Sequence, residues 1–338
     1  MPTSSRLARR SVLGAGVGAG LGLLAGPALA QQRARLTFAL SWIPNVQFAG
    51  LWVAMERGHF ATEGLDVRFT PGGPNAPDPL VQLAADNAQI CTANWLPFLD
   101  AVGRGNDFVI IGAIYARSPG AICSMSRRPV RTPQDLVGAR VLAQTPSDRL
   151  IIESILGMAS LPRDFRMIPT GFSPEPLVNG DGDAYFCFAI NQPITLERMG
   201  LRPGVDFHVT LLDQLGYSLP GQFIVTRRRF IEQNRAQVVG FLRAFARGWR
   251  ENEADAAFAA RLAVQKYGAE LGLELPQQVR QNELQIPLVR NSAGPGFLWF
   301  DPAKIGGSMT EIARVSNRVV PPVEQILDLS LIDAASRA

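Results

Sequence analysis

Amide and hydroxyl side chains follow two of the apolar stretches in this sequence. Asn191 and Gln192 come directly after the apolar run that ends at Ile190. A carboxamide can donate and accept hydrogen bonds in one plane, which is what the N–H and C=O edge of a heterocycle requires. A second polar group follows another apolar stretch and contains Gln144, Thr145, Ser147 and Asp148. These side chains either bind the edge of a ring or only cap a helix.

Aromatic side chains offer the stacking faces that a flat ring needs. Trp42 lies at the end of a predicted strand and is followed by Pro44 and Asn45, which favour a turn. Further aromatic candidates are Phe48, Trp52, Trp95, Tyr115 and Tyr185. Large aromatic residues usually belong to a hydrophobic core, so each of these is either a core residue or a ligand contact. Stacking faces together with amides favour a flat heterocyclic ligand.

The residues of covalent and metal-dependent catalysis are scarce. The chain has two lysines, Lys266 and Lys304, and two histidines, His59 and His208. It contains no G-x-S-x-G, Walker or H-E-x-x-H motif. Carboxylates are common in any protein, so acid–base pairs are left open. We therefore expect no enzyme, no cofactor and no metal site.

Three cysteines, Cys91, Cys123 and Cys187, lie far apart in apolar contexts. Their number is odd and their spacing does not match a metal site. We expect them to be small buried hydrophobic residues.

The elements that would position the polar and aromatic residues alternate between strands and helices. Large apolar residues at 36–42 alternate with smaller ones, which is the period-two pattern of a strand. A helix should follow, because Asn45 is a good N-cap and Gly58 a good C-terminal stop. Further predicted elements are a strand at 66–70, a helix at 80–88 and a buried strand at 108–114.

A second cycle of the same kind begins after Arg131. Thr132 and Pro133 should open a short helix, and Ser147 should cap a longer one. The other predicted elements are strands at 140–143 and 184–190, a strand at 223–226 that crosses back to the first half, and a long amphipathic helix containing 238–249. Alternating strands and helices predict α/β structure with mostly parallel sheets. In such sheets ligands bind beyond the carboxyl ends of the strands.

Several motifs in a fixed order resemble one family of solute-binding proteins. W-I-P-N at 42–45 precedes an aromatic-rich helix, and G-H-F-A-T-E-G-L-D-V follows at 58–67. Further matches are P-G-G-P-N at 71–75, T-P-Q-D-L-V-G at 132–138, L-V-N-G-D-G-D-A-Y at 177–185 and N-Q-P at 191–193. Each motif alone is weak, but their order and spacing across residues 36–260 are specific. The chain resembles the binding proteins for thiamine-precursor pyrimidines, riboflavin, sulfonates and nitrate.

The resemblance implies the two-lobed fold of a type II periplasmic binding protein. Each lobe would be a mostly parallel sheet flanked by helices, with the ligand in the cleft between the lobes. The expected divisions are lobe one at 36–125 and 219–300, lobe two at 126–218, and a C-terminal segment at 301–338 that packs on lobe one. Closure would follow because the ligand binds the closed state better.

The same resemblance suggests where the ligand would be contacted. The turn at 42–45 would line the cleft, and Asn94 with Trp95 would form another cleft loop. Phe48 stands where pyrimidine-binding relatives have histidine, which favours a larger flat ligand such as a flavin. Arg117 would matter only for an anionic ligand.

The function implied is capture of a small flat heterocycle and its delivery to an ABC permease and ATPase in the inner membrane, by a monomer. A sulfonate such as taurine, or nitrate, is the alternative ligand. A pyrimidine-synthase-like enzyme is disfavoured, because its lysine and histidine would fall at 90–100, which contains neither. A sensor or interaction module with the same lobes is a third possibility.

The first thirty residues are expected to be an export signal. Arg9 and Arg10 precede an uncharged run at 12–29, and A-L-A ends at Ala30, where we expect cleavage. The paired arginines resemble a twin-arginine signal, and a periplasmic location follows; an uncleaved membrane anchor is the alternative. Cleavage would leave 308 of the 338 residues and lower the net charge of +4 by three, to +1. A nucleic-acid partner is not implied, and the length suits two domains.

Overall fold

A computed structural model describes residues 33–292 and 294–337 of the chain. The expected export signal at 1–30 and its cleavage after Ala30 lie outside the described residues. Among the residues that are described, none of the helices combines the length and apolar character needed to cross a bilayer.

The first sheet contains five strands in the order β2-β1-β3-β10-β4. Its strands are β1 (Ala34–Ala39), β2 (Leu65–Thr70), β3 (Ile90–Ala93), β4 (Phe108–Tyr115) and β10 (Gly221–Arg227). Strands β1, β2 and β3 run parallel, whereas β10 is antiparallel to both of its neighbours, β3 and β4. The strand predicted at 223–226 therefore does return to the first sheet.

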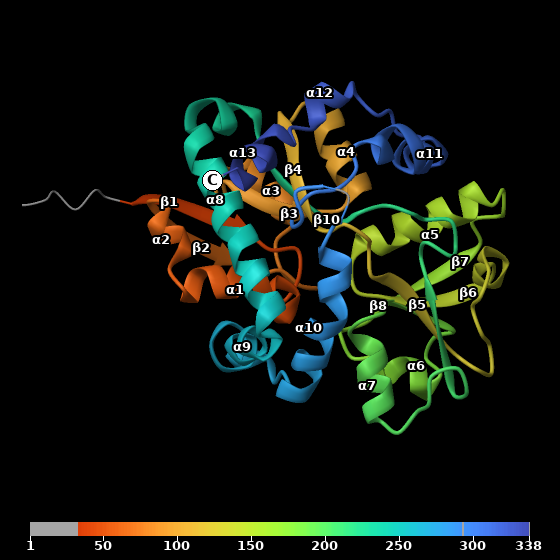
Figure 1. Cartoon of the computed structure of the whole chain (residues 1–338). Helices are drawn as coiled ribbons and strands as arrows, with labels where there is room; N and C mark the ends of the chain where they lie inside the picture. The colour runs from red at the N-terminus through yellow and green to blue at the C-terminus, as the bar shows by residue number, and fades with distance from the viewer. Residues whose placement is uncertain (1–32, 293, 338) are drawn as a thin grey trace, which may run out of the picture. The chain divides into compact units, whose positions relative to one another are not determined.

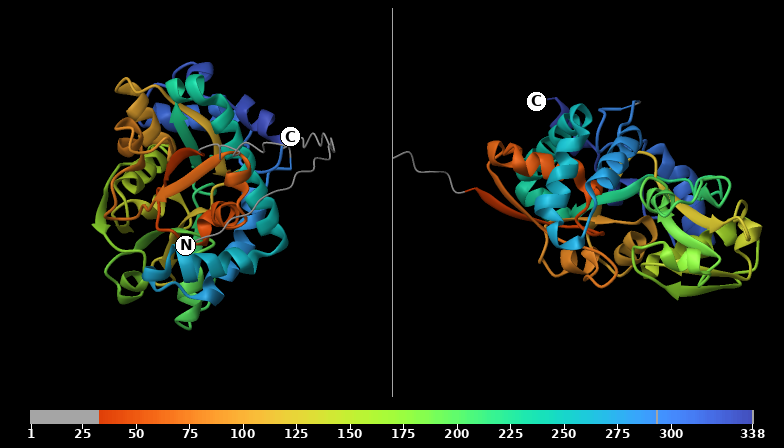
Figure 2. Two further views of the ribbon diagram at one scale, coloured as in Figure 1. Left: turned by 90° about the vertical axis from the view of Figure 1, so that its left-hand side faces the viewer. Right: turned by 90° about the horizontal axis from the view of Figure 1, so that it is seen from below.

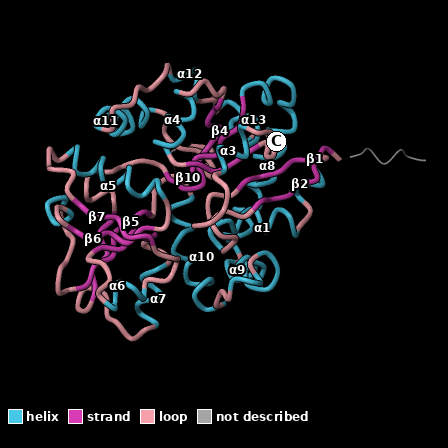
Figure 3. Tube along the Cα trace, turned by 180° about the vertical axis from the view of Figure 1, so that it is seen from behind, coloured by secondary structure: helices cyan, strands magenta, loops and turns pink. Residues whose placement is uncertain are grey.

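The second sheet repeats this pattern with the order β7-β6-β8-β5-β9. Its strands are β5 (Gly120–Met125), β6 (Ala139–Ala143), β7 (Phe165–Pro169), β8 (Ala184–Phe188) and β9 (Phe207–Leu211). Here β5 is the antiparallel member, paired with β8 and β9. The predicted α/β class with mostly parallel sheets is confirmed, and the two groups of strands are visible in Figure 3.

Helices accompany both sheets (Figure 1). The helices that lie between β1 and β4 in the sequence are α1 (Ala49–Glu56), α2 (His59–Thr62), α3 (Pro79–Ala84) and α4 (Trp95–Gly103). Those that follow β10 are α8 (Arg228–Ala254), α9 (Ala256–Leu262), α10 (Leu275–Val289), α11 (Thr310–Val315), α12 (Val323–Ile326) and α13 (Ser330–Ser336). The helices between the strands of the second sheet are α5 (Pro146–Met158), α6 (Glu175–Asn179) and α7 (Gln192–Arg198). Single turns form at Val46–Phe48, Pro133–Leu136 and Ala269–Leu271 as 3-10 helix, and at Ala263–Tyr267 and Ile305–Met309 as π-helix.

Helices α1 and α8 pack side by side because glycines let their backbones approach (Figures 1 and 2). A Cβ on Gly248 would lie 2.0 Å from the carbonyl oxygen of Gly50. A Cβ on Gly50 would lie 2.4 Å from the ring of Trp249, which is fully buried. This contact covers one face of the first sheet with the aromatic rings of α8.

The C-terminal segment touches elements of both sheets. The Asp328 N–H donates to the carbonyl of Ile110 in β4 at 3.0 Å. After α11, the Ser316 hydroxyl lies 2.8 Å from that of Ser154 in α5.

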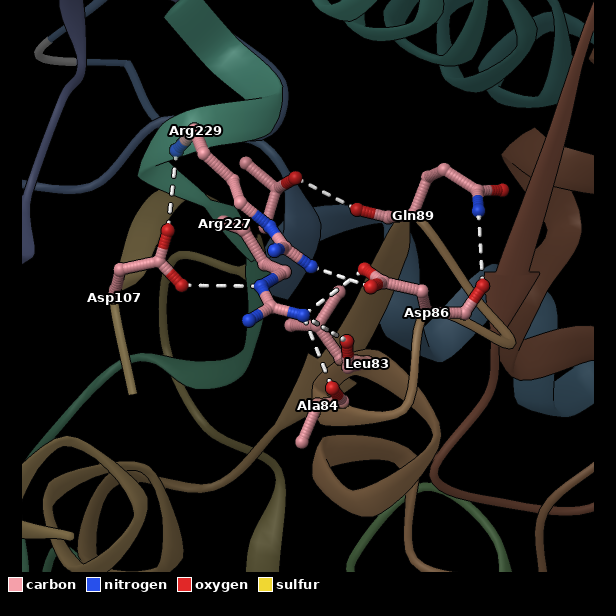
Figure 4. A network of polar contacts seen from close by, with 8 residues as sticks. Leu83, Ala84, Asp86, Gln89, Asp107, Arg227 and Arg229 are labelled. Carbon is pink, nitrogen blue, oxygen red and sulfur yellow. Dashed lines mark hydrogen bonds and ion pairs between the residues drawn. The ribbon is translucent and has the colours of Figure 1, made fainter. Parts of the chain in front are cut away.

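An ion-pair network fixes the first sheet at the end of β10 (Figure 4). The Arg227 guanidinium donates to Asp107 at 3.0 Å and to Asp86 at 2.9 Å. Arg229, in the first turn of α8, also pairs with Asp86 and donates its backbone N–H to Asp107 at 3.2 Å. The hydrogen bond from Arg229 and the charge of Arg227 hold the pKa of Asp86 below its usual value. The network joins α3, β4 and α8 to the returning strand.

Both chain passages between the sheets connect carboxyl edges. The chain leaves the end of β4 at Tyr115 and begins β5 at Gly120, which pairs with Phe188, the last residue of β8. It leaves β9 at Leu211 and begins β10 at Gly221, which pairs with Tyr115. The edges that bind ligands in parallel sheets are therefore the edges that the passages hold together.

We expect Gly248→Ala to lower the free energy of unfolding by about 1–3 kcal/mol or more, because a methyl group would force α1 and α8 apart. Urea unfolding followed by circular dichroism measures this. Gly103→Ala is the matched control, since a Cβ there meets nothing within 4 Å. Equal stability of the two variants would contradict the proposed close packing.

Candidate functional site

A small polar cluster lies at the carboxyl edge of the first sheet. The Ser41 N–H, just after β1, donates to the Thr92 hydroxyl at 2.8 Å, and that hydroxyl lies 3.0 Å from the Ser41 hydroxyl. The Gln222 Nε2 donates to the same serine oxygen at 3.2 Å. None of these three residues was among the predicted ligand contacts. Thr92 lies within the apolar strand β3 and Gln222 is the second residue of β10, so only their position at the edge of the sheet indicates a role.

The turn that follows β1 is pinned to the loop that follows β2. The Gly72 N–H donates to the Trp42 carbonyl at 3.0 Å. A Cβ on Gly72 would lie 2.3 Å from the Leu40 carbonyl oxygen, so this approach requires glycine. Trp42 itself is half-buried and packs against the first core.

Asn45 acts as the predicted helix cap. Its Oδ1 accepts from the Gln47 N–H at 2.9 Å, and its carbonyl accepts from the Trp52 indole at 2.7 Å. The helix begins with the 3-10 turn Val46–Phe48 and continues as α1. Asn45 is also buried, and its side-chain oxygen is occupied by this hydrogen bond to the backbone.

The other aromatic candidates lie inside the cores. Trp52 stacks on Tyr267 with ring centroids 4.5 Å apart, and Trp95 donates to the Met309 carbonyl at 2.9 Å. The Tyr185 hydroxyl donates to the Gly171 carbonyl at 3.0 Å. Those with less than 2% exposure are Phe48, Trp52, Trp95, Tyr115 and Tyr185. Their packing accounts for them as core residues, and ligand contact by any of them stays a prediction.

The polar group at 144–148 is engaged in capping α5. Thr145 is the N-cap, Pro146 occupies the first turn, and Asp148 closes the capping box. The Asp148 carboxylate accepts from the N–H groups of Gln144 at 2.9 Å and Thr145 at 3.0 Å, and from the Thr145 hydroxyl at 2.8 Å. The prediction that Ser147 caps this helix was wrong. Its hydroxyl lies 3.1 Å from that of Thr145, inside the first turn.

Asp148 is a buried carboxylate with hydrogen-bond donors but no ion-pair partner among the described residues. Burial raises its pKa, and the three hydrogen bonds from Thr145 and Gln144 only partly oppose that shift. The side-chain amide of Gln144 donates to the carbonyl of Phe186, in the middle of β8, at 2.8 Å.

The two amides after β8 have separate roles. Gln192 is buried, and its Oε1 accepts from the Phe188 N–H at 3.0 Å. Asn191 is half-buried, and its Oδ1 accepts from Gln277 on α10 at 3.0 Å. This bond joins the second sheet to the helix that lies across the carboxyl edge of the first. Asn94, between β3 and α4, is exposed.

Helix α10 is the element that brings several candidates together. Gln278 accepts from the Val46 N–H at 2.9 Å. Gln285 accepts from the Tyr115 hydroxyl and donates to the Val46 carbonyl, both at 2.7 Å. Tyr115, the turn after Asn45, and Asn191 are thus connected through one helix, and Trp52 lies in the same core as Tyr115. Trp95 and Tyr185 lie apart, each in another core.

The cysteines are buried, as expected, and occur as free thiols. Cys123 and Cys187 lie on neighbouring strands with their sulfurs 3.1 Å apart. Burial raises the pKa of the Cys91 thiol. The described part of the chain holds no cluster of three or more histidine, cysteine or acidic side chains suited to a metal ion.

Comparison with known proteins identifies the family. The NMT1/THI5 like family profile matches residues 45–256, which is more than half of the chain. The protein belongs to the NMT1/THI5 like family. Both predictions of the sequence analysis, the family and the fold, are confirmed.

Two curated proteins of this kind are similar over most of their length. The riboflavin-binding protein RibY of Chloroflexus aurantiacus is 27% identical over 301 residues, covering 86% of this chain and 83% of RibY. The formylaminopyrimidine-binding protein of Halalkalibacterium halodurans is 26% identical over 269 residues, covering 76% of this chain and 78% of its own. Among solved structures, the alkanesulfonate-binding protein SsuA of Xanthomonas axonopodis pv. citri shares the fold, with a TM-score of 0.62 and 18% sequence identity. The match covers 90% of this chain and 98% of the SsuA chain.

We expect the stability contribution of Asp148 to fall as the pH rises. Folding raises the pKa of Asp148, so around and above about pH 4 the native state holds this proton more tightly than the unfolded state does. The stabilising contribution is therefore present below about pH 4 and is lost as the pH rises through the raised pKa. In urea titrations, the advantage of the wild type over Asp148→Asn should be largest below about pH 4 and smaller at pH 7.

Asp183→Asn is a control of opposite sign. The hydrogen bond from Arg140 lowers the pKa of Asp183, so its contribution should grow as the pH rises from the acid side. A pH-independent difference for Asp148→Asn would show that burial does not shift that carboxyl.

Proposed function

We propose that this protein is the exported ligand-capturing subunit of an ABC importer and binds a flat, uncharged heterocycle of the riboflavin or pyrimidine kind. Family membership supports a solute-binding role. The ligands that give RibY and the formylaminopyrimidine-binding protein their names support the ligand class. Export to the periplasm and delivery to a membrane permease are parts of this proposal.

The observation that carries the proposal is the meeting of the two carboxyl edges. Both passages between the sheets join these edges, and the Ala189 N–H donates to the Pro119 carbonyl at 2.8 Å where the first passage enters the second sheet. The rings of Tyr115 and Phe188 also meet there edge to face, with centroids 5.9 Å apart. A ligand held between the edges would contact both halves and favour their closure.

In this arrangement the lobes are the parts built on each sheet, residues 36–119 with 219–300 and residues 120–218. The predicted boundary at 125 moves because β5 (Gly120–Met125) pairs with β8 and β9 of the second sheet. The bonds between α10 and α7 are those that opening would break. They include Gln277 with Asn191 and the ion pair of Arg280 with Glu197 at 2.8 Å. Such exposed pairs are individually weak, which suits a contact that forms and breaks.

Absence of catalysis is also part of the proposal. Residues 90–100, where a synthase would need lysine and histidine, form β3 and the start of α4 and contain neither. The buried groups at this edge are amides and hydroxyls, which bind a ligand without transforming it.

Thermal unfolding of the purified protein with riboflavin, formylaminopyrimidine, taurine and nitrate tests the ligand class. We expect riboflavin or formylaminopyrimidine to raise the Tm, because a ligand at a hundred times its Kd stabilises by about 2.7 kcal/mol. Mass spectrometry of any copurified molecule provides an independent readout. Stabilisation by taurine or nitrate alone would overturn the proposed ligand class.

Trp42→Ala should weaken binding of the stabilising ligand at least tenfold and leave the secondary structure intact, because this half-buried residue lies at the carboxyl edge, after the end of β1. Trp42→Phe is the control, since it keeps a stacking face. Loss of circular dichroism signal in Trp42→Ala would instead make this residue part of the core.

A further inference from the structure

Several buried amide atoms near the carboxyl edge of the first sheet have no hydrogen-bond partner. Within residues 33–292 and 294–337 these are the Nε2 of Gln47, the Oε1 of Gln222, and both the Nε2 and Oε1 of Gln281. An unpaired buried polar group is destabilising, and native proteins pair nearly all of their buried polar groups. Three glutamines with unpaired atoms on elements that meet at one edge therefore require an explanation.

Gln281 is the clearest of the three, because it is fully buried and neither amide atom is paired. On α10 it lies one turn from Gln277 and one turn from Gln285, on the same face. Gln277 reaches Asn191 of the second sheet, and Gln285 reaches Tyr115 of the first. Gln281 therefore lies between these two contacts, where the halves of the protein meet.

The neighbours of Gln281 show that α10 can satisfy its buried amides. Gln278 and Gln285 bond to Val46, and Asn282 exchanges hydrogen bonds with Asn252 at 2.7 and 3.0 Å. Only Gln281 among the buried amides of this helix has both polar atoms unpaired. Methionine would fill the same space without that cost.

Gln222 carries a second sign of constraint. It is 6% exposed and has a φ of 54°, a left-handed conformation that is unusual for a residue other than glycine. Its Nε2 is held by Ser41, while its Oε1 has no partner. Strained backbone of this kind persists where the surroundings enforce it, and often at ligand sites.

We propose that Gln281 and Gln222 form hydrogen bonds with the polar edge of the ligand's ring, in the site of the proposed function, on which this inference rests. When the two edges separate, the Gln281 amide would donate to a ring carbonyl, and the two glutamine oxygens would accept from ring N–H groups. A heterocycle with adjacent C=O and N–H groups offers both partners. A sulfonate group or a nitrate offers only acceptors, so an oxyanion in this place would leave both glutamine oxygens unpaired.

Gln281→Met separates a ligand role from a packing role. We expect the Tm of the ligand-free protein to stay the same or rise, because an unpaired buried amide is removed. The Kd for riboflavin, measured by titration calorimetry with formylaminopyrimidine as a second probe, should rise at least tenfold. Gln285→Met is the matched control and should lower the ligand-free Tm, because it leaves the Tyr115 hydroxyl and the Val46 carbonyl unpaired.

Gln222→Gly provides a second variant, since glycine tolerates the left-handed backbone and removes the amide. It should also weaken riboflavin binding at least tenfold. Unchanged Kd values in both variants would overturn this inference and leave the proposed function standing. A wild-type protein that binds taurine or nitrate and neither heterocycle would overturn both.

Discussion

The exchange of one antiparallel strand between the two halves is the constraint on which the rest of the structure depends. Strand β10 enters the first sheet beside the end of β4, and β5 begins beside the end of β8. Because both connections are short, the carboxyl edges of the two sheets must stay close to one another. The ion pairs of Arg227 fix the opposite end of β10, so the strand is held at both ends.

This constraint explains why α10 matters more to the site than its place late in the sequence suggests. The helix lies against the turn after Asn45, against Tyr115 and against α7 of the second half. Its amides replace water as partners for the polar backbone of that turn. A helix with only apolar residues on this face would leave the Val46 N–H and carbonyl unpaired.

Much of the fold could be predicted, because periodicity and caps are local. The cap at Asn45 and the long apolar face of α8 determine elements from nearby residues. The alternation at 36–42 located β1, although the strand is Ala34–Ala39 and Trp42 lies in the turn after it. Side-chain roles at the site were harder to predict. Ser147 and Thr145 are both good caps by type, and only the geometry of the Asp148 carboxylate decides between them. Gln222 and Gln281 were missed because their significance depends on partners that they lack, which no local pattern can reveal.

Charge chemistry separates the two ligand classes that share this fold. An oxyanion is best held by cations or by converging N–H donors. The groups at the first sheet's edge are instead a serine, a threonine and several glutamines. The unpaired atoms of these glutamines include both N–H donors and oxygen acceptors. Arg117 follows β4 but is exposed, and its backbone N–H bonds to the Leu288 carbonyl of α10 at 3.2 Å. A neutral donor–acceptor edge therefore suits the buried groups better than a negative charge does, because it leaves no carboxamide oxygen facing another acceptor.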